Sequence, residues 1–317
     1  MACSRAGFER MAAHVEAQRE RLGLEAEVVS AAAFRDRYFD SALLHGGALL
    51  RPTFGLNPLK YHLGLARAAA ARGARLHAGS EVLDWSRDGG AHRLTTAGGS
   101  LRAGHVIVAA NGFMPEHLDG RLRGRTLPMI SAIVVTRPME RDEMDLQAWR
   151  TDCPSITSVN LLNYFRMLPD RRFMFGGRGS ADGSEQSADA NFRKLAAWLR
   201  ELFPRWRDVD IDYRWHGLVC MNRRLTPAIG RFEDEPSVLF GFGYHGNGVN
   251  TATWTGRALA NWLASGQHAP PPGIPAAMLG LPGRVPLPGL RLIYIRAGIA
   301  VRRRADRRES RRGAAIS

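Results

Sequence analysis

The residues best suited to chemistry lie in one glycine-rich stretch, Gly241–Asn250, which reads GFGYHGNGVN. It follows the apolar run Ser237–Phe240, matches the pattern G-x-G-x-x-G and precedes a segment with helical spacing. Glycines let a ligand approach the backbone closely, and a helix amino terminus attracts negative charge. The stretch therefore predicts either a site for a flat or electron-rich group or a glycine turn that holds no ligand.

A dinucleotide-binding fingerprint needs more than these glycines. It is followed by a second strand whose Asp or Glu, roughly 20 residues on, binds the ribose. Here the helix expected over about Val249–Leu263 leads to Gly266 and then to Pro270–Gly273. No acidic residue occurs between Glu235 and Asp306. The turn therefore does not qualify as a pyrophosphate cradle.

The elements before this turn indicate an α/β arrangement. The strand-like segment 46–55 is followed by a helix over 59–72, with Asn57 and Pro58 as its N-cap and first residue. A second strand is expected over 74–85. Such a strand–helix–strand crossover predicts parallel pairing of the two strands.

Farther along, we expect a hairpin around Gly98-Gly99 and then the apolar strand Val106–Ala110. A fully apolar strand that ends in Asn-Gly is typical of a central parallel strand covered on both faces. Open α/β sheets place ligands at the carboxyl ends of such strands.

Outside this region the pattern changes. Residues 7–24 predict an amphipathic helix, and 189–206 predict another, which Pro204 stops. From about 127 to 212, alternating segments predict an antiparallel sheet. These segments are LPMISAIVVTRPM, SITSVNLLNYFRMLP, RRFMFGGRG and VDIDYRWHGLV.

The composition is that of a globular chain, because 45% of the 317 residues are hydrophobic and 23% are charged. No apolar run is long enough to cross a bilayer, and the start MACSRAGFER lacks the core of a signal peptide. Cys3, Cys153 and Cys220 lie far apart, which argues against a disulfide framework or a metal site. The expected location is the cytoplasm.

The formal net charge of +14 is not read as a nucleic-acid signal. Lys60 and Lys194 are the only lysines among 44 basic residues, an imbalance typical of a GC-rich coding sequence. Seven arginines lie in Val301–Ser317, which we expect to be a solvated, frayed terminus, with polyanion binding as an alternative. Signatures of phosphoryl transfer, zinc proteolysis and α/β-hydrolase chemistry are absent from the sequence.

Six segments from about His45 to Gly266 resemble, together and in order, the D-amino-acid oxidase (DAO) superfamily of FAD-dependent oxidoreductases. The nearest sub-pattern is that of γ-glutamylputrescine oxidase-like enzymes. The segments are GGALLRPTFGLNPLKYHLGLARAAAARGARLHAGSEV, VIVAANGFMPEHL, LPMISAIVVTRPM, NYFRMLPDRRFMFGGR, LFPRWRDVDIDYRWHGLVCMNRRLTPAIGR and GFGYHGNGVNTATWTGRALANWLASG.

The resemblance implies an α/β fold with a discontinuous, Rossmann-like FAD-binding domain over 45–114 and 214–266. An antiparallel-sheet α+β substrate domain would comprise 1–44 and 115–213, and 267–317 would form a Pro/Gly-rich segment and basic tail. Members carry a further G-x-G-x-x-G near the amino terminus, which nothing before His45 matches. The FAD-binding domain is therefore expected to be incomplete at its amino-terminal end, without the first βαβ unit.

The same resemblance assigns the cofactor contacts. Val82 would meet the adenine end of FAD through its backbone. The segment after the apolar strand would line the cofactor with Ala109, Ala110, Asn111 and Gly112. The glycine-rich turn would wrap the flavin ring with Gly241, Gly243, Tyr244, Gly246, Asn247, Gly248 and Val249. No metal is implied.

The implied activity is oxidation of the C–N bond of an amine or amino acid to an imine, with dioxygen reoxidising the flavin to give hydrogen peroxide. Tyr164 and Arg166 are candidates for substrate contact; Arg166 either pairs a substrate carboxylate or points outward into solvent. His245 either hydrogen-bonds flavin or substrate or is satisfied by backbone. Cys220 lies near a position of covalent flavin attachment in some relatives, but a lone buried thiol is the favoured interpretation.

Two further hypotheses stay open. The chain is alternatively a catalytically inactive remnant that keeps a ligand- or partner-binding role, or an arginine-tailed protein that binds polyanions. The expected partner of the active form is a small amine or amino acid, with no nucleic acid.

Overall fold

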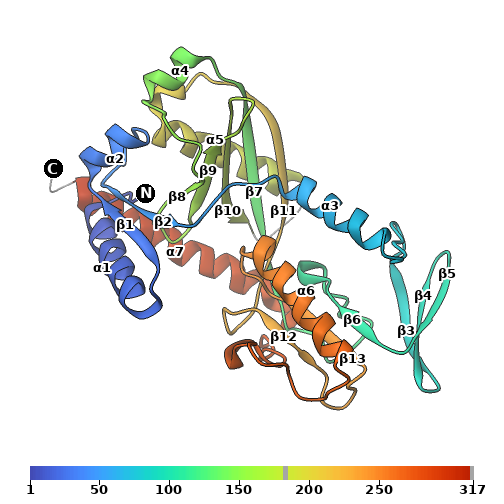
Figure 1. The fold of residues 1–317 in the computed structure, drawn as a ribbon. Coiled ribbons are helices and arrows are strands. Elements are labelled where there is room, and N and C mark those ends of the chain that lie inside the picture. Colours follow the sequence, from blue (N-terminus) through green and yellow to red (C-terminus); the bar gives the residue numbers. More distant parts are fainter. Residues whose placement is uncertain (181–184, 315–317) are drawn as a thin grey trace. The chain divides into compact units, whose positions relative to one another are not determined.

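The computed structural model describes residues 1–180 and 185–314, which form two compact units (Figure 1). The first unit comprises Met1–Gly55, Ile130–Gly217 and Leu292–Ser317. The second comprises Leu56–Met129 and Leu218–Arg291. Each unit is therefore discontinuous in sequence. The predicted division into a FAD-binding and a substrate domain stays a prediction.

The first unit is built on a five-stranded sheet with the strand order β11-β7-β10-β9-β8. Strand β10 pairs antiparallel with both β7 and β9, and β8 pairs antiparallel with β9. The antiparallel sheet predicted from alternation is thus confirmed. The bounds are β7 (Leu127–Pro138), β8 (Ser155–Ile156), β9 (Asn163–Met167), β10 (Arg172–Ser180) and β11 (Ile211–Met221).

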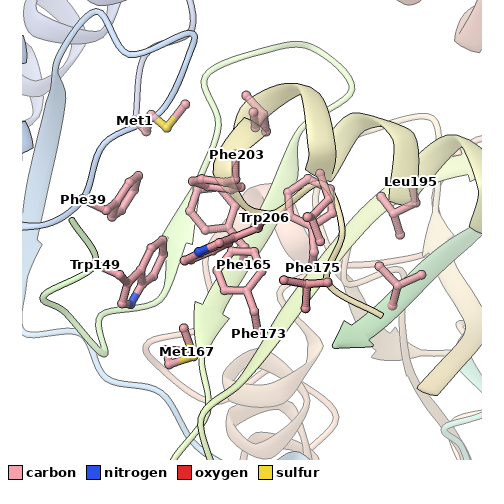
Figure 2. Close-up of a cluster of buried hydrophobic side chains, with 14 of the residues drawn as sticks. Met1, Phe39, Trp149, Phe165, Met167, Phe173, Phe175, Leu195, Phe203 and Trp206 are labelled. Atoms are coloured by element: carbon pink, nitrogen blue, oxygen red, sulfur yellow. The ribbon is translucent and has the colours of Figure 1, made fainter. Parts of the chain in front are cut away.

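Helix α5 (Glu185–Leu202) packs against this sheet, and the core of the unit lies between them. The helix contributes buried residues at spacings of three and four, which is the period of one helix face; they are Ala188, Phe192, Leu195, Leu199 and Leu202. It ends just before Pro204, as predicted. Figure 2 shows the aromatic part of the core, in which the rings of Phe39 and Trp149 stack with centroids 4.5 Å apart.

The amino-terminal part of the first unit begins with helix α1 (Arg5–Leu22), whose Ser4 N-cap hydroxyl accepts a hydrogen bond from the Gly7 amide. The predicted helix over 7–24 is confirmed. Short helices α2 (Ala31–Arg37) and α4 (Arg141–Leu146) also belong to this unit. Strand β1 (Glu25–Val29) pairs antiparallel with β2 (Gly47–Arg51).

That pairing corrects the predicted strand–helix–strand unit. Helix α3 (Pro58–Ala70) is present, and the Asn57 side chain caps it by accepting from the Lys60 amide. Strand β2, however, is already paired by β1, and the next strand β3 begins only at Val82. The expectation of parallel pairing between 46–55 and 74–85 is wrong, because each strand takes a partner close to it in sequence.

Strand β3 (Val82–Asp88) instead starts a three-stranded antiparallel sheet in the second unit. It pairs with β4 (Ala91–Thr96), which pairs with β5 (Gly99–Ala103). The β4–β5 connection is the hairpin predicted at Gly98-Gly99, with Thr96 opposite Gly99.

The other sheet of the second unit has the order β12-β13-β6. Its bounds are β12 (Ala228–Arg231), β13 (Val238–Phe242) and β6 (Val106–Val108). Strand β6 is parallel to β13, as predicted for an α/β sheet, but β13 is the central strand. Strand β6 lies at an edge and leaves Ile107 42% exposed, so its prediction as a central, doubly covered strand is wrong.

Helix α6 (Gly248–Ala264) packs on this sheet through Leu259 and Trp262. The helix predicted over Val249–Leu263 is therefore confirmed, and so is the strand–turn–helix order around GFGYHGNGVN. The turn connects the central strand of the sheet directly to the helix that covers it.

The arginine-rich end is helical rather than frayed over its described part. Helix α7 spans Arg291–Ala314, buries Ile295 and Ile299, and uses Asp306 to accept hydrogen bonds from the amides of Asn160 and Leu161. The expectation of a frayed terminus is wrong, because these contacts order helix α7, which extends to Ala314. Residues 315–317 of the chain lie outside the described residues. Among the described helices, none has the length and apolar character to span a membrane.

Candidate functional site

The candidate site is built around the turn between β13 and α6. Three residues of this turn have positive φ: Gly243 at 78°, His245 at 54° and Gly246 at 101°. The Asn247 amide bonds the Tyr244 carbonyl over 2.9 Å, and the His245 amide bonds the Cys220 carbonyl on β11 over 3.0 Å. Backbone hydrogen bonds therefore fix a tight reversal immediately before the helix.

Two of the glycines are required by packing. A Cβ on Gly241 would lie 2.5 Å from Cγ2 of Thr255, so this glycine brings β13 close to α6. A Cβ on Gly243 would lie 2.6 Å from Nδ2 of the buried Asn222. Protein atoms therefore occupy the space beside both glycines, and their predicted contact with the flavin ring stays a prediction.

The end of strand β6 meets the same turn. Oδ1 of Asn111 accepts a 3.0 Å hydrogen bond from the Gly243 amide. Gly112 is held tightly as well, because a Cβ there would lie 2.9 Å from Cβ of Leu218. The structure therefore brings the predicted segment Ala109–Gly112 together with the predicted turn, at the carboxyl ends of two parallel strands.

The amino end of α6 is the open part of this site. The first amides of an α-helix have no acceptor within the helix, and the helix dipole makes this end electropositive. Asn247 makes no side-chain capping bond here, and the first turn has no acidic residue. A Cβ on Gly248 would lie 3.8 Å from Cβ of Tyr244, which is an ordinary contact, so neither crowding nor a positive φ accounts for this glycine.

These features fit a flavin in part. An electron-rich ring edge would find preorganised donors at Gly248 and Val249, next to the exposed Gly246 and Asn247. Beside β6 and β13, by contrast, Asn111 already occupies the Gly243 amide. The Gly243 amide is therefore already paired, whereas the first amides of α6 have no acceptor within the helix.

Two buried groups at the turn, one on β11 and one within the turn itself, are neutral. Burial raises the pKa of the Cys220 thiol to about 12. Burial also raises the pKa of the Tyr244 hydroxyl. Cys220 is therefore a protonated, buried thiol in this structure, which agrees with the favoured interpretation from sequence.

Val82 lies in a different sheet from the turn. It opens β3, opposite Thr96 on β4, and the ladder is irregular between Val82 and Asp84. Its predicted contact with the adenine end of FAD stays a prediction.

Tyr164 and Arg166 lie in the first unit, on β9. Their neighbours Phe165 and Met167 point into the core, so alternation places Tyr164 and Arg166 on the opposite face of the sheet, half-buried. The Tyr164 ring lies across Gly176 of β10, and its hydroxyl is 3.0 Å from Oγ of Ser131 on β7.

Arg166 packs against the backbone at Gly55, where a Cβ would meet Nη1 of its guanidinium. It is therefore not the freely solvated side chain that the sequence left as an alternative. Its predicted role in pairing a substrate carboxylate is untested.

The residues that support these candidates were not predicted as site residues from the sequence. Ser131 and Gly176 set the position of Tyr164. Asn222 lies against Gly243, and Leu218 lies against Gly112. Alternation along β7 and β10 is a signal that could have placed Ser131 and Gly176 on one face. Contacts of Asn222 and Leu218 with the glycines are tertiary, and no local pattern indicates them.

Comparison with solved structures shows the fold class to which this geometry belongs. Glycine oxidase from Bacillus cereus matches with a TM-score of 0.68 and 16% identity, over 84% of this chain and 72% of that one. L-proline dehydrogenase from P. horikoshii matches with a TM-score of 0.69 and 18% identity, over 86% and 72%. The fold is therefore the one that these two enzymes share, which combines α/β and antiparallel-sheet parts.

Sequence comparison then identifies the family. Residues 1–262 match the family model described as DAO, FAD dependent oxidoreductase. The probable oxidoreductase OrdL of Haemophilus influenzae is 31% identical over 228 residues, which are 71% of this chain and 51% of that protein. Gamma-glutamylputrescine oxidoreductase of Escherichia coli is 28% identical over 240 residues, 76% of this chain and 54% of that protein. The chain belongs to the DAO family of FAD-dependent oxidoreductases, and it spans about half the length of these curated relatives.

Proposed function

We propose that this chain takes part in FAD-dependent oxidation of the C–N bond of an amine or amino acid to an imine, with electrons passing to dioxygen to give hydrogen peroxide. Family membership supports the reaction class. The observation that carries the proposal is the open, electropositive end of α6 beside the carboxyl ends of β6 and β13. Bound FAD would supply the oxidising group that the protein side chains lack.

The residues of the second unit would bind and orient the cofactor. The amides of Gly248 and Val249 would face the ring edge that becomes negative on reduction, with Gly246 and Asn247 beside it. Ala109 and Ala110 would line the cofactor, and Val82 its adenine end. In this proposal Asn111 and Gly112, with Gly241, Gly243 and Tyr244, shape the pocket floor through the contacts described above.

The residues of the first unit would meet the substrate. Tyr164 presents a hydroxyl held by Ser131 on the face of the sheet away from the core. Arg166 on the same face carries the charge that a substrate carboxylate would pair with. The turn residue His245 is the third candidate, for a hydrogen bond to flavin or substrate.

Flavin uptake by the purified chain tests this proposal. We expect added FAD to bind and to lose its free fluorescence, and Gly248→Ala to weaken that binding at least about tenfold, because its methyl group would enter the space in front of the helix. The matched control is Gly256→Ala on the same helix, where a Cβ meets nothing within 4 Å. The control should bind FAD normally and be slightly more stable.

A different result would favour the second candidate function. That candidate is a catalytically inactive family member that keeps a ligand- or partner-binding role. If the purified chain is colourless and takes up no FAD while both alanine variants remain folded, the oxidase proposal fails and this alternative stands.

A further inference from the structure

The side chain of His92 joins the two sheets of the second unit. It lies on β4 and is fully buried. Its Nδ1 accepts a 3.0 Å hydrogen bond from the indole N–H of Trp85 on β3. Its Nε2 lies 2.9 Å from Oγ of Ser237, the residue before β13. Trp85 also packs against the core formed by β6, β12 and β13.

The contact with Trp85 points to one tautomer of the neutral ring. An indole N–H can only donate, so Nδ1 must be the unprotonated acceptor. The neutral ring then carries its proton on Nε2, which donates to the Ser237 hydroxyl. Arg87 can only donate, so its Nη1, 3.1 Å from Nε2, makes no hydrogen bond to the ring in this tautomer. A second proton would have to sit on Nδ1, where it would face the N–H of Trp85, and that hydrogen bond would be lost.

We propose that His92 is a proton-sensitive junction, which in its neutral form holds the β3–β4–β5 sheet against the β6–β13 sheet and when protonated loosens it. The Ser237 carbonyl accepts from the Val106 amide, so the residue that His92 contacts also joins β13 to β6. The junction therefore lies at the amino-terminal ends of the two parallel strands, opposite the glycine-rich turn.

The charged groups around the His92 ring would only partly offset the positive charge that protonation adds to it. Arg87 of β3 places Nη1 3.1 Å from Nε2, and Glu235 places Oε1 3.8 Å from it. Glu235 is also bonded to Arg87 at 3.0 Å and to Arg121 at 2.9 Å. Arg121 adds positive charge near the ring, and His105 adds more when it is protonated. Among the described residues, the carboxylate that acts on His92 is Glu235, and two guanidiniums share it.

The electrostatics agree in direction with the geometry. Burial lowers the pKa of His92, Glu235 raises it, and Arg87, His105 and Arg121 lower it. Because the folded-state pKa lies below the unfolded value of about 6.5, the unfolded chain binds this proton more tightly. The stabilisation by neutral His92 is therefore complete above about pH 6.5 and is lost as the pH falls toward the folded-state value.

The junction would affect the geometry of the candidate site. It connects the sheet that begins at Val82 with the sheet whose central strand leads into the glycine-rich turn. These are the two regions predicted to hold opposite ends of FAD. The inference itself depends only on contacts within the second unit, so it stands or falls independently of flavin binding or turnover.

Nuclear magnetic resonance of the imidazole nitrogens in the full chain tests the proposal directly. We expect His92 to be the neutral Nε2–H tautomer at about pH 7.5 and to titrate below the ordinary histidine pKa of about 6.5. Amide exchange in β4 and in residues 237–240 should accelerate by roughly fivefold to tenfold as the pH falls through that titration, after correction for the intrinsic pH dependence. A ring protonated on Nδ1 at neutral pH, or exchange that does not follow the titration, would overturn the proposal.

A pair of glutamine variants separates the junction from a general effect of histidine. His92→Gln cannot take up a proton but keeps an acceptor and a donor, so the acid-induced acceleration should disappear. His77→Gln changes an exposed histidine of the same unit, and this variant should keep the acid-induced acceleration of amide exchange. Equal acid sensitivity in both variants would contradict the proposal; should His92→Gln fail to fold, the nitrogen titration of the unaltered chain decides.

Discussion

The Gly243 amide donates a 3.0 Å hydrogen bond to Oδ1 of Asn111, so one side chain joins the residues that follow β6 to the turn that follows β13. Asn111 has a φ of +46°, a conformation that asparagine adopts more readily than most residues. The arrangement serves the fold whether or not a ligand is present.

Replacing this side chain should therefore loosen the turn. We expect Asn111→Ala to destabilise the region by about 1–3 kcal/mol, because it leaves the Gly243 amide without its acceptor and puts alanine at positive φ. Hydrogen exchange of residues 238–244 measures the effect. Asn111→Asp keeps the acceptor and should stay close to the unaltered protein; equal loss in both variants would show that the hydrogen bond contributes little.

The close approach of β13 and α6 gives a second prediction. Gly241→Ala would place a methyl group 2.5 Å from Cγ2 of Thr255 and should cost about 1–3 kcal/mol. Adding Thr255→Ser removes Cγ2 and should recover most of that loss. The midpoint of thermal unfolding, compared for the single and double variants, checks this; without recovery, the crowding does not lie at Thr255.

The hydroxyl pair on the first unit's sheet gives a third prediction. Ser131→Ala and Tyr164→Phe remove the same 3.0 Å hydrogen bond, so their costs should not add. We expect each variant to lose about 0.5–1.5 kcal/mol and the double variant to lose little more. Urea unfolding of the four proteins measures the coupling. Additive losses would mean that the two hydroxyls act separately.

Glu143 gives a prediction about acid stability. Hydrogen bonds from Arg137, at 2.8 and 2.6 Å, and from the Glu140 amide lower the pKa of Glu143 to about 2. Because the folded-state pKa lies below the ordinary carboxyl pKa, ionised Glu143 stabilises the fold at pH values above that ordinary pKa. This stabilisation is lost as the pH falls toward 2.

Because both side chains are partly exposed, Glu143→Gln should cost only about 0.5–1 kcal/mol at pH 7. The difference from the unaltered chain should shrink as the pH is lowered, which urea unfolding at several pH values can follow. The exposed Glu201→Gln on the same unit is the control and should change little. A constant deficit at all pH values would point to packing instead of charge.

Local patterns were sufficient for elements whose structure depends on near neighbours. Alternation predicted the strands around Phe165 and Phe175, Asn57 and Pro58 predicted the start of α3, and the glycines predicted a tight turn before α6. Each of these signals acts within a few residues of the chain.

Strand partners and tertiary contacts could not be predicted from such local patterns. Nothing local shows that β2 takes β1 as its partner, or that β13 and not β6 is central. For the site, the sequence indicated the turn and the strand end as separate pieces. The Asn111–Gly243 bond and the His92 junction connect residues more than a hundred positions apart, so only the folded chain shows them.

Asp306 links the arginine-rich end of the chain to the strand that carries the substrate candidates. Its carboxylate bonds the backbone at Asn160 and Leu161, three residues before Tyr164. A protease that cleaves after the arginines at 302–304 would release this carboxylate and leave those amides to water. Proteolytic cleavage in the arginine-rich segment would thereby alter the loop that leads into β9.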